Sequence, residues 1–182
     1  MLANSKELAL GSSAPAFSLL GTDRKKYSLE SFNGAKLLVI IFTSNTCPYA
    51  QAYEQRFISM QRDYGNDGVS FCAINSNDEK ALPEENYTQM QARARTSQLN
   101  YPYLRDESQR VAQAYNAACT PDVYLYDAQR KLRYHGRCDD NWKEPTQVKR
   151  RELTRAIELM LQNKPIDFEM RPATGTAIRW KK

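Results

Sequence analysis

The sequence predicts an α/β fold built on a parallel strand pair, and three stretches carry this prediction. Residues Leu37 to Phe42 form a continuous apolar run rich in β-branched residues, which is typical of a strand buried on both faces. After the polar bend 43–46, large apolar side chains recur every three or four positions, as on one helix face: Tyr49, Tyr53, Phe57, Met60 and Tyr64. A second apolar run, Val69 to Asn75, completes a strand–helix–strand unit, whose right-handed crossover makes its strands parallel.

The segment before this unit predicts a hairpin. Short strands at 17–20 and 26–29 flank the turn signal Gly21-Thr22-Asp23. Residues 28–32 then indicate a short helical turn that ends at Asn33-Gly34. We therefore expect an N-terminal hairpin extension on a central mixed sheet flanked by helices.

The second half of the chain continues the alternation of helices and strands. We expect helices at 84–98, 108–117 and 146–162, a short strand at 101–104, and an antiparallel pair at 123–126 and 132–136. The tail predicts an irregular surface segment with Ile178 and Trp180 as anchors. The expected organisation is one domain at 1–164 followed by the tail 165–182, which packs on that domain or extends from it.

Composition bounds the class of protein. A length of 182 residues with 41% hydrophobic content fits a single globular domain, and no run is long enough to span a membrane. The first residues show no secretion signal, so we expect a cytoplasmic protein. The four cysteines lie far apart and there is one histidine, so we expect neither a zinc site nor a cofactor.

The net charge of +5 is concentrated in the last third of the chain. From Gln129 onward there are 14 Lys and Arg against 7 Asp and Glu. A basic region can attract nucleic acid, but no nucleic-acid motif accompanies it and a solvated helix face explains it more simply. We therefore expect no nucleic-acid partner.

Cys47 is the candidate nucleophile. It lies between the polar bend and the helix, with Pro48 suited to the first helical position. Unpaired N–H groups and the helix dipole favour an anion there, so the sequence predicts a thiol pKa below the ordinary value of about 8.5. The alternative is a small buried hydrophobe, the commonest role of a free cysteine.

In combination these elements resemble the thioredoxin fold, and more narrowly the redoxin (AhpC/TSA-like) branch, over about residues 8–162. The chain is most similar to a peroxiredoxin-like, thioredoxin-family group that is recognised by three motifs. These are Asn45-Thr46-Cys47-Pro48-Tyr49, Cys119-Thr120-Pro121-Asp122 and Gly136-Arg137-Cys138-Asp139-Asp140-Asn141. The resemblance implies a thiol-based oxidoreductase.

Two departures from the related families restrict the chemistry. Ala50 stands where thioredoxins carry the second cysteine of Cys-x-x-Cys, so resolution within one helical turn is impossible. Ile40 and Ser44 stand where peroxiredoxins carry the proline and threonine that cradle a peroxide. Peroxidase activity is therefore the second hypothesis rather than the first.

The resemblance also suggests the surroundings of Cys47. It implies that the Thr120-Pro121 loop faces Cys47, with a candidate cis bond, and that the Thr120 backbone pairs with an extended substrate. Cys119 is either the resolving cysteine or a core residue, and the sequence leaves both open. Thr46, Pro48 and Tyr49 are expected to border the site.

Arg137 and His135 are weaker candidates. The Arg137 guanidinium could stabilise a thiolate or hold a peroxide oxygen, but a salt bridge to Asp139 or Asp140 is the expected role. His135 is expected at the surface or at a sheet edge.

Three functions remain open at this point. The first is a thiol-disulfide oxidoreductase that acts on a disulfide or oxidised substrate and takes electrons from Cys119 or an external thiol reductant. The second is an antioxidant hydroperoxide reductase. The third is a redox-sensing or partner-binding module without turnover. The sequence does not distinguish a monomer from a homodimer.

Overall fold

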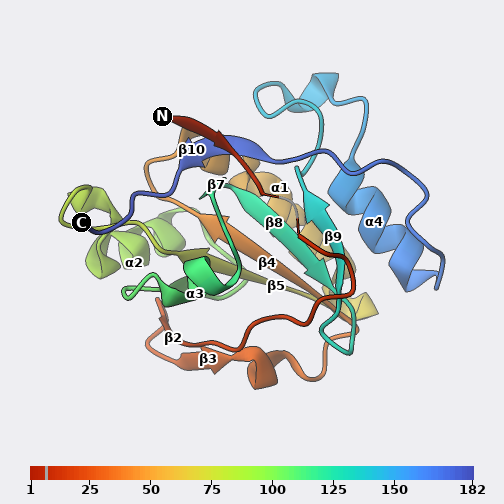
Figure 1. Cartoon of the computed structure of the whole chain (residues 1–182), viewed down its shortest axis with the longest axis horizontal. Coiled ribbons are helices and arrows are strands. Elements are labelled where there is room, and N and C mark those ends of the chain that lie inside the picture. Colours follow the sequence, from red (N-terminus) through yellow and green to blue (C-terminus); the bar gives the residue numbers. More distant parts are fainter. Residues whose placement is uncertain (7) are drawn as a thin grey trace.

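The computed structural model describes residues 1–6 and 8–182 and contains a seven-stranded mixed sheet (Figure 1). The strand order is β3-β2-β6-β5-β4-β8-β9. The strands are β2 (Ser18–Gly21), β3 (Lys26–Ser28), β4 (Leu37–Thr43), β5 (Val69–Asn75), β6 (Tyr103–Arg105), β8 (Asp122–Tyr126) and β9 (Leu132–Gly136). The predicted α/β class, the N-terminal hairpin and the mixed sheet are confirmed.

Strand β4 lies at the centre and is buried along almost its whole length. It pairs in parallel with β5, Ile40 opposite Cys72, and antiparallel with β8, Ile40 opposite Tyr124. Six consecutive residues, 37–42, are buried, because neighbours cover both edges and helices or loops cover both faces.

Alternate residues of β4 supply two separate cores. Val39 and Ile41 pack in the core that contains side chains of α1 (Pro48–Tyr64), α2 (Tyr87–Thr96) and α4 (Glu152–Leu161). Leu38, Ile40 and Phe42 pack in the other core, with α3 (Arg110–Ala114) and Ile178 of the tail. The sheet is therefore the middle layer of three, as the period of two in a strand requires.

A second, small sheet brings both ends of the chain together. The tail strand β10 (Thr174–Ala177) lies between β1 (Leu2–Asn4) and β7 (Cys119–Thr120), antiparallel to both. The tail is thus partly regular, contrary to expectation. Ile178 is 4% exposed and anchors it, whereas Trp180 is 39% exposed and does not.

Three helices are shorter than the sequence predicts. The run 84–98 divides into a 3-10 turn, Pro83–Glu85, and α2, because the Asn86 side chain accepts the Gln89 N–H and caps a new helix. The run 108–117 is helical only over α3, after Gln109 at φ 63°. Helix α4 begins at Glu152 rather than Thr146, because Lys149 N–H and the Arg150 carbonyl bond to Asp140 instead of extending the helix.

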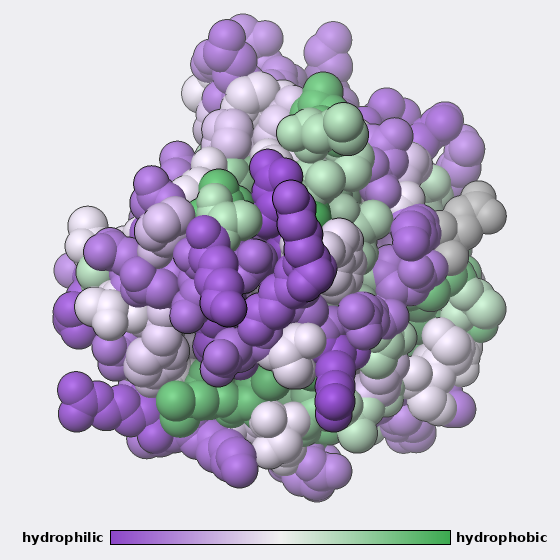
Figure 2. Space-filling view, turned by 60° about the vertical axis from the view of Figure 1, so that its left-hand side comes forward, coloured by the Kyte–Doolittle hydropathy of each residue, from purple (hydrophilic) through white to green (hydrophobic). Residues whose placement is uncertain are grey.

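The face drawn in Figure 2 is mostly hydrophilic. Figure 2 shows one face on which hydrophobic residues reach the surface in small, separate areas among polar ones. None of the helices within 1–6 and 8–182 combines the length and apolar character that crossing a membrane requires.

Candidate functional site

Cys47 is the N-cap residue of α1, directly beyond the end of β4. Its backbone is extended, Pro48 occupies the first helical turn, and the Ala50 N–H points at Sγ across 3.5 Å. The polar bend after β4 turns the chain into the helix, so the thiol lies against the unpaired N–H groups of the first turn. Cys47 is only 1% exposed.

The loop before strand β8 lies directly against Cys47. The Thr120-Pro121 peptide bond is cis, as the sequence suggests, and Thr120 is buried. The Cys47 thiol donates to the Thr120 carbonyl oxygen, with 2.9 Å between Sγ and O. This hydrogen bond joins the Cys47 motif and the Thr120-Pro121 motif, whose bonded residues are 73 positions apart in the sequence.

A buried carboxylate, Glu85, holds the bend that precedes Cys47. Its side chain accepts Ser44 Oγ at 2.5 Å, Thr46 Oγ1 at 2.6 Å and the backbone N–H groups of Asn45 and Thr46 at 2.9 and 3.0 Å. Asn75 Nδ2 donates a further bond of 2.6 Å. Ser44 Oγ in turn accepts the Cys47 N–H. Glu85 is fully buried, so these donors replace the water that its charge would otherwise need.

Sequence reasoning missed Glu85. It lies in the polar stretch 84–98, which the sequence predicts as a helix, 39 to 41 residues from the hydroxyls that it binds. The available signal was the polar bend itself, because two hydroxyls and free N–H groups under a buried loop require an acceptor.

Cys119 is a free thiol enclosed beneath the tail. It is 0% exposed, and its sulfur lies 3.8 Å from the carbonyl oxygens of Pro121 and Ala173. Burial, the Asp122 carboxylate and Cys47 all raise its thiol pKa, with burial the largest cause. The residue whose backbone meets the Cys47 sulfur is its neighbour Thr120, one position further on.

His135 lies in β9, an edge strand of the sheet, which is one of the two expected positions, but its side chain is largely enclosed rather than at the surface. Its side chain is 6% exposed, its Nε2 lies 2.8 Å from Asp122 Oδ1, and its ring stacks on Tyr124 with 4.2 Å between centroids. The reason is the β8–β9 pairing, which sets His135 opposite Tyr124 and beside a fully buried carboxylate. The Tyr124 hydroxyl donates to the other oxygen of Asp122.

Arg137 pairs with Glu152 at the start of α4, at 2.5 Å, rather than with Asp139 or Asp140. Asp139 is instead held by Arg56 of α1. Arg137 nevertheless lines a cavity of about 140 Å³ together with Pro121, Tyr53, Trp142 and Ala173. Its guanidinium therefore shares this cavity with the cis-proline but is already paired with Glu152.

The remaining candidates lie at the surface around the helix start. Thr46 and Pro48 are exposed, and Tyr49 is half-buried. The Tyr49 ring packs on Trp142, with 4.3 Å between the ring centroids, and Trp142 in turn lines the small cavity.

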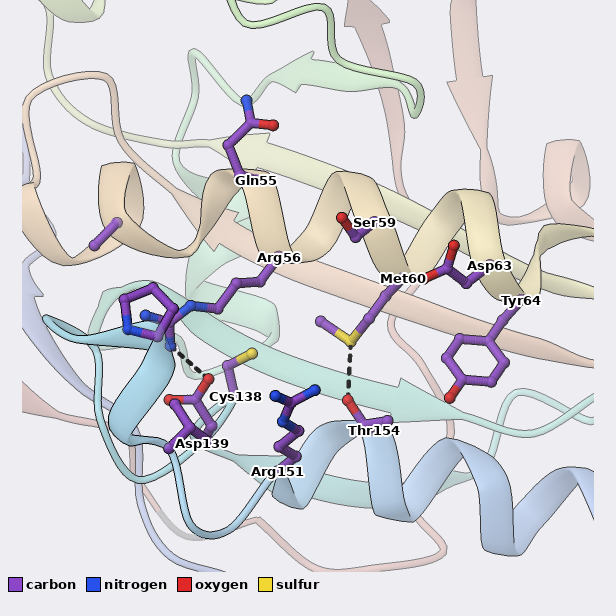
Figure 3. A pocket seen from close by; sticks show the side chains of 13 residues that line it. Gln55, Arg56, Ser59, Met60, Asp63, Tyr64, Cys138, Asp139, Arg151 and Thr154 are labelled. Atoms are coloured by element: carbon purple, nitrogen blue, oxygen red, sulfur yellow. Dashed lines mark hydrogen bonds and ion pairs between the residues drawn. The ribbon is translucent and has the colours of Figure 1, made fainter.

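A separate cavity of about 410 Å³ lies between α1 and α4 (Figure 3). Arg56, Ser59 and Met60 line it from α1, and Arg151 and Thr154 line it from the opposite side. It shares Cys138 and Asp139 with the smaller cavity, but neither Cys47 nor Pro121 lines it. Burial raises the pKa of the Cys138 thiol far above its ordinary value.

A cysteine that caps the helix after a central strand, and that faces a cis-proline loop at the start of the neighbouring antiparallel strand, defines a thioredoxin-fold protein. The AhpC/TSA family matches residues 10–135, and the chain belongs to that family. No match was found among curated proteins.

Solved structures agree with this assignment. An uncharacterized conserved protein from Geobacillus kaustophilus is 35% identical, with a TM-score of 0.95 over 100% of this chain and 97% of its own. A putative thiol:disulfide interchange protein DsbE from Chlorobium tepidum is 20% identical, with a TM-score of 0.64 over 85% and 99%. Peroxidoxin BcpB from Mycobacterium tuberculosis is 16% identical, with a TM-score of 0.59 over 70% and 84%. The last two show the shared fold.

Proposed function

We propose that the protein is a thiol-disulfide oxidoreductase of the redoxin type, with Cys47 as its nucleophile. The observation that carries the proposal is the position of Cys47 Sγ, between the first-turn N–H of Ala50 and the carbonyl next to the cis-proline. A developing negative charge on sulfur is stabilised by the helix N-terminus. The thiol:disulfide interchange protein with the same fold supports this class of reaction.

The reaction at Cys47 consists of two exchanges at sulfur. The Cys47 thiolate attacks one sulfur of a disulfide, that S–S bond breaks, and the other sulfur leaves as a thiolate that takes up a proton. A second thiolate then attacks the mixed disulfide at Cys47, forms a disulfide with the substrate sulfur and releases the Cys47 thiolate. These two exchanges reduce one substrate sulfur to a thiol and leave the other in a disulfide with the second thiol, which is thereby oxidised. A further molecule of the second thiol attacks that disulfide at the sulfur of the second thiol, so the other substrate sulfur leaves as a thiolate and the two thiol molecules end as a disulfide.

We propose that the second thiol comes from outside the chain. Cys119 is the internal alternative, but its sulfur is enclosed between Pro121 and Ala173 and its raised pKa leaves little thiolate. An external low-molecular-weight thiol or a reduced protein thiol can instead attack the mixed disulfide at Cys47.

Hydroperoxide reduction is the second candidate, favoured by membership of the AhpC/TSA family. Two observations weigh against it. Ile40 is fully buried within β4, and Ser44 Oγ already donates to Glu85 while accepting the Cys47 N–H. Neither is free to position a peroxide. We expect Cys47 to react with hydrogen peroxide no faster than an ordinary thiol.

The test compares Cys47→Ser and Cys119→Ser with the unchanged protein in glutathione-dependent reduction of a small disulfide. Serine retains a cap acceptor at 47 and a small polar side chain at 119, so both variants should fold. We expect no turnover with Cys47→Ser and unchanged turnover with Cys119→Ser. Turnover that persists in Cys47→Ser contradicts the proposal, and a mixed disulfide that accumulates only in Cys119→Ser identifies Cys119 as the resolving residue.

A further inference from the structure

The strand site next to the cis-proline is occupied by the tail of the same chain. Strand β10 pairs antiparallel with β7, Thr176 opposite Thr120 and Ala177 opposite Cys119. It also contacts α1, the helix that Cys47 caps. Figure 1 shows β10 passing beside β7 and the N-terminal strand.

Because Gly175 has no side chain, the backbone of β10 can lie directly against the Thr120 carbonyl. A Cβ at Gly175 would lie 2.0 Å from the Thr120 carbonyl oxygen, a distance that no side chain tolerates. The same oxygen accepts the hydrogen bond of the Cys47 thiol. The tail and the nucleophile therefore converge on one atom, and Cys47 is 1% exposed with the strand in place.

The strand is held at both of its ends. Upstream, the tail crosses β9 so closely that a Cβ at Gly136 would lie 2.4 Å from the Arg171 carbonyl oxygen. Downstream, Ile178 is buried, and the Arg179 backbone bonds to Asn77 and Gln109. Between these anchors Thr174 is exposed, and Thr176 and Ala177 are half-buried. A short surface strand between two fixed points can lift without unfolding the domain.

We propose that residues 174–177 form a self-bound peptide on the substrate strand site, and that Cys47 reacts only when this strand has lifted. The proposal rests on the function proposed above and adds its regulation. The ligand that takes the place of β10 is an extended polypeptide with glycine opposite the Thr120 carbonyl. Main-chain pairing provides its affinity, as in other cases of strand addition.

The first test is Gly175→Ala, with Gly34→Ala as its matched control. The added methyl collides with the Thr120 carbonyl, whereas a Cβ at Gly34 meets nothing within 4 Å. Iodoacetamide labelling is followed at each of the four cysteines by peptide mass spectrometry. We expect Cys47 of Gly175→Ala to react at least about tenfold faster than in the unchanged protein, and Gly34→Ala to match that protein. An unchanged rate in Gly175→Ala, or equal acceleration of all four cysteines, overturns the proposal.

A peptide added in trans makes the test specific. The octapeptide Ala-Thr-Gly-Thr-Ala-Ile-Arg-Trp, residues 173–180, should protect Cys47 of Gly175→Ala again. The same peptide with alanine in place of its glycine should not. Equal protection by both peptides, or by neither, contradicts a strand site with this glycine requirement.

The unchanged protein provides a measurement that needs no variant. The Ala177 N–H, inside the strand, bonds to the Met1 carbonyl, and its hydrogen exchange reports lifting of residues 174–177. We expect the protection of Cys47 from iodoacetamide to equal the protection of this amide and to be far smaller than that of β4 amides. The proposal is overturned if Cys47 is protected from iodoacetamide as strongly as the β4 amides are protected from exchange, or if Cys47 is not protected at all.

The two proposals fail separately. If Gly175→Ala labels faster but forms no mixed disulfide with a small disulfide, the tail covers Cys47 and the oxidoreductase assignment is wrong. If the unchanged protein turns over a disulfide at the same rate as Gly175→Ala, the oxidoreductase stands and control by the tail is wrong.

Discussion

Glu85 is the residue on which the position of Cys47 depends. Five donors from the bend and from Asn75 converge on a carboxylate that is 0% exposed. The bend has no regular structure of its own, and Glu85 accepts four of its hydrogen bonds, from Ser44, Asn45 and Thr46. Glu85 therefore acts on the chemistry through the Ser44–Cys47 contact, as a positioning residue.

Glu85→Gln is expected to destabilise the protein by about 1–3 kcal/mol, because an amide NH₂ replaces an acceptor and leaves buried donors unpaired. Glu84→Gln is the control, since Glu84 is exposed and should change stability by less than about 0.5 kcal/mol. Urea denaturation measures both effects.

A second measurement separates positioning from stability. Under conditions where both variants are folded, we expect Glu85→Gln to form the mixed disulfide at Cys47 more slowly, while Glu84→Gln matches the unchanged protein. A rate equal to that of Glu84→Gln would leave Glu85 with a structural role alone.

At the scale of elements, the sequence predicts what local periodicity encodes. The buried strand β4, the helix α1 and the Thr120-Pro121 loop all follow from apolar spacing and from local residue chemistry. The sequence places the start of helix α4 six residues too early, because Asp140 forms hydrogen bonds with the backbone of residues 149 and 150 and so keeps them out of the helix. A long-range hydrogen bond of this kind leaves no periodic trace.

The loop after β9 shows the same limit. Its Asp139 was expected to pair with the nearby Arg137, but α1 supplies Arg56 instead, from 83 positions away. Arg56 also donates to the carbonyls of Asn141 and Trp142 at 2.8 and 2.9 Å. One side chain thus fixes the loop that carries Trp142 against Tyr49.

Arg56→Ala should therefore cost about 2–4 kcal/mol, because it leaves the Asp139 carboxylate, 5% exposed, without its cation. The matched control on the same helix is Arg62→Ala. Its ion pair with Asp63 is 67% and 54% exposed, so solvent screens it and the change should be below about 0.5 kcal/mol. Equal shifts in the urea midpoint of the two variants would show that the Arg56–Asp139 pair adds nothing to stability.

At the scale of the whole molecule, tyrosines occupy both cores. Tyr53, Tyr101, Tyr103 and Tyr134 pack on the α1 side of the sheet, and Tyr115, Tyr124 and Tyr126 pack on the other. Helical and strand periodicity identified many of these positions as inward-facing, but the polar groups that meet their hydroxyls were not predictable. The Tyr124–Asp122–His135 contact is an example.

Burial raises the pKa of nine of the 11 tyrosines, and for Tyr27 and Tyr64 the raised pKa is about 12. The unfolded chain loses these protons near pH 10, while the folded chain retains them. The folded state therefore binds more protons than the unfolded state between about pH 10 and 12. The tyrosines make their full contribution to the free energy of unfolding below pH 10, and this contribution is lost as the pH rises through this window.

The measurement is an alkaline titration that follows tyrosinate absorbance and circular dichroism together. We expect these nine tyrosines to ionise only as the circular dichroism signal is lost, in one cooperative step above pH 10. In guanidinium chloride all 11 should ionise gradually near pH 10. Ionisation of most tyrosines at pH 10.5 with native circular dichroism would mean that solvent reaches both faces of the sheet, and the packing that seats β4, the cis-proline loop and the Cys47 helix against one another would be wrong.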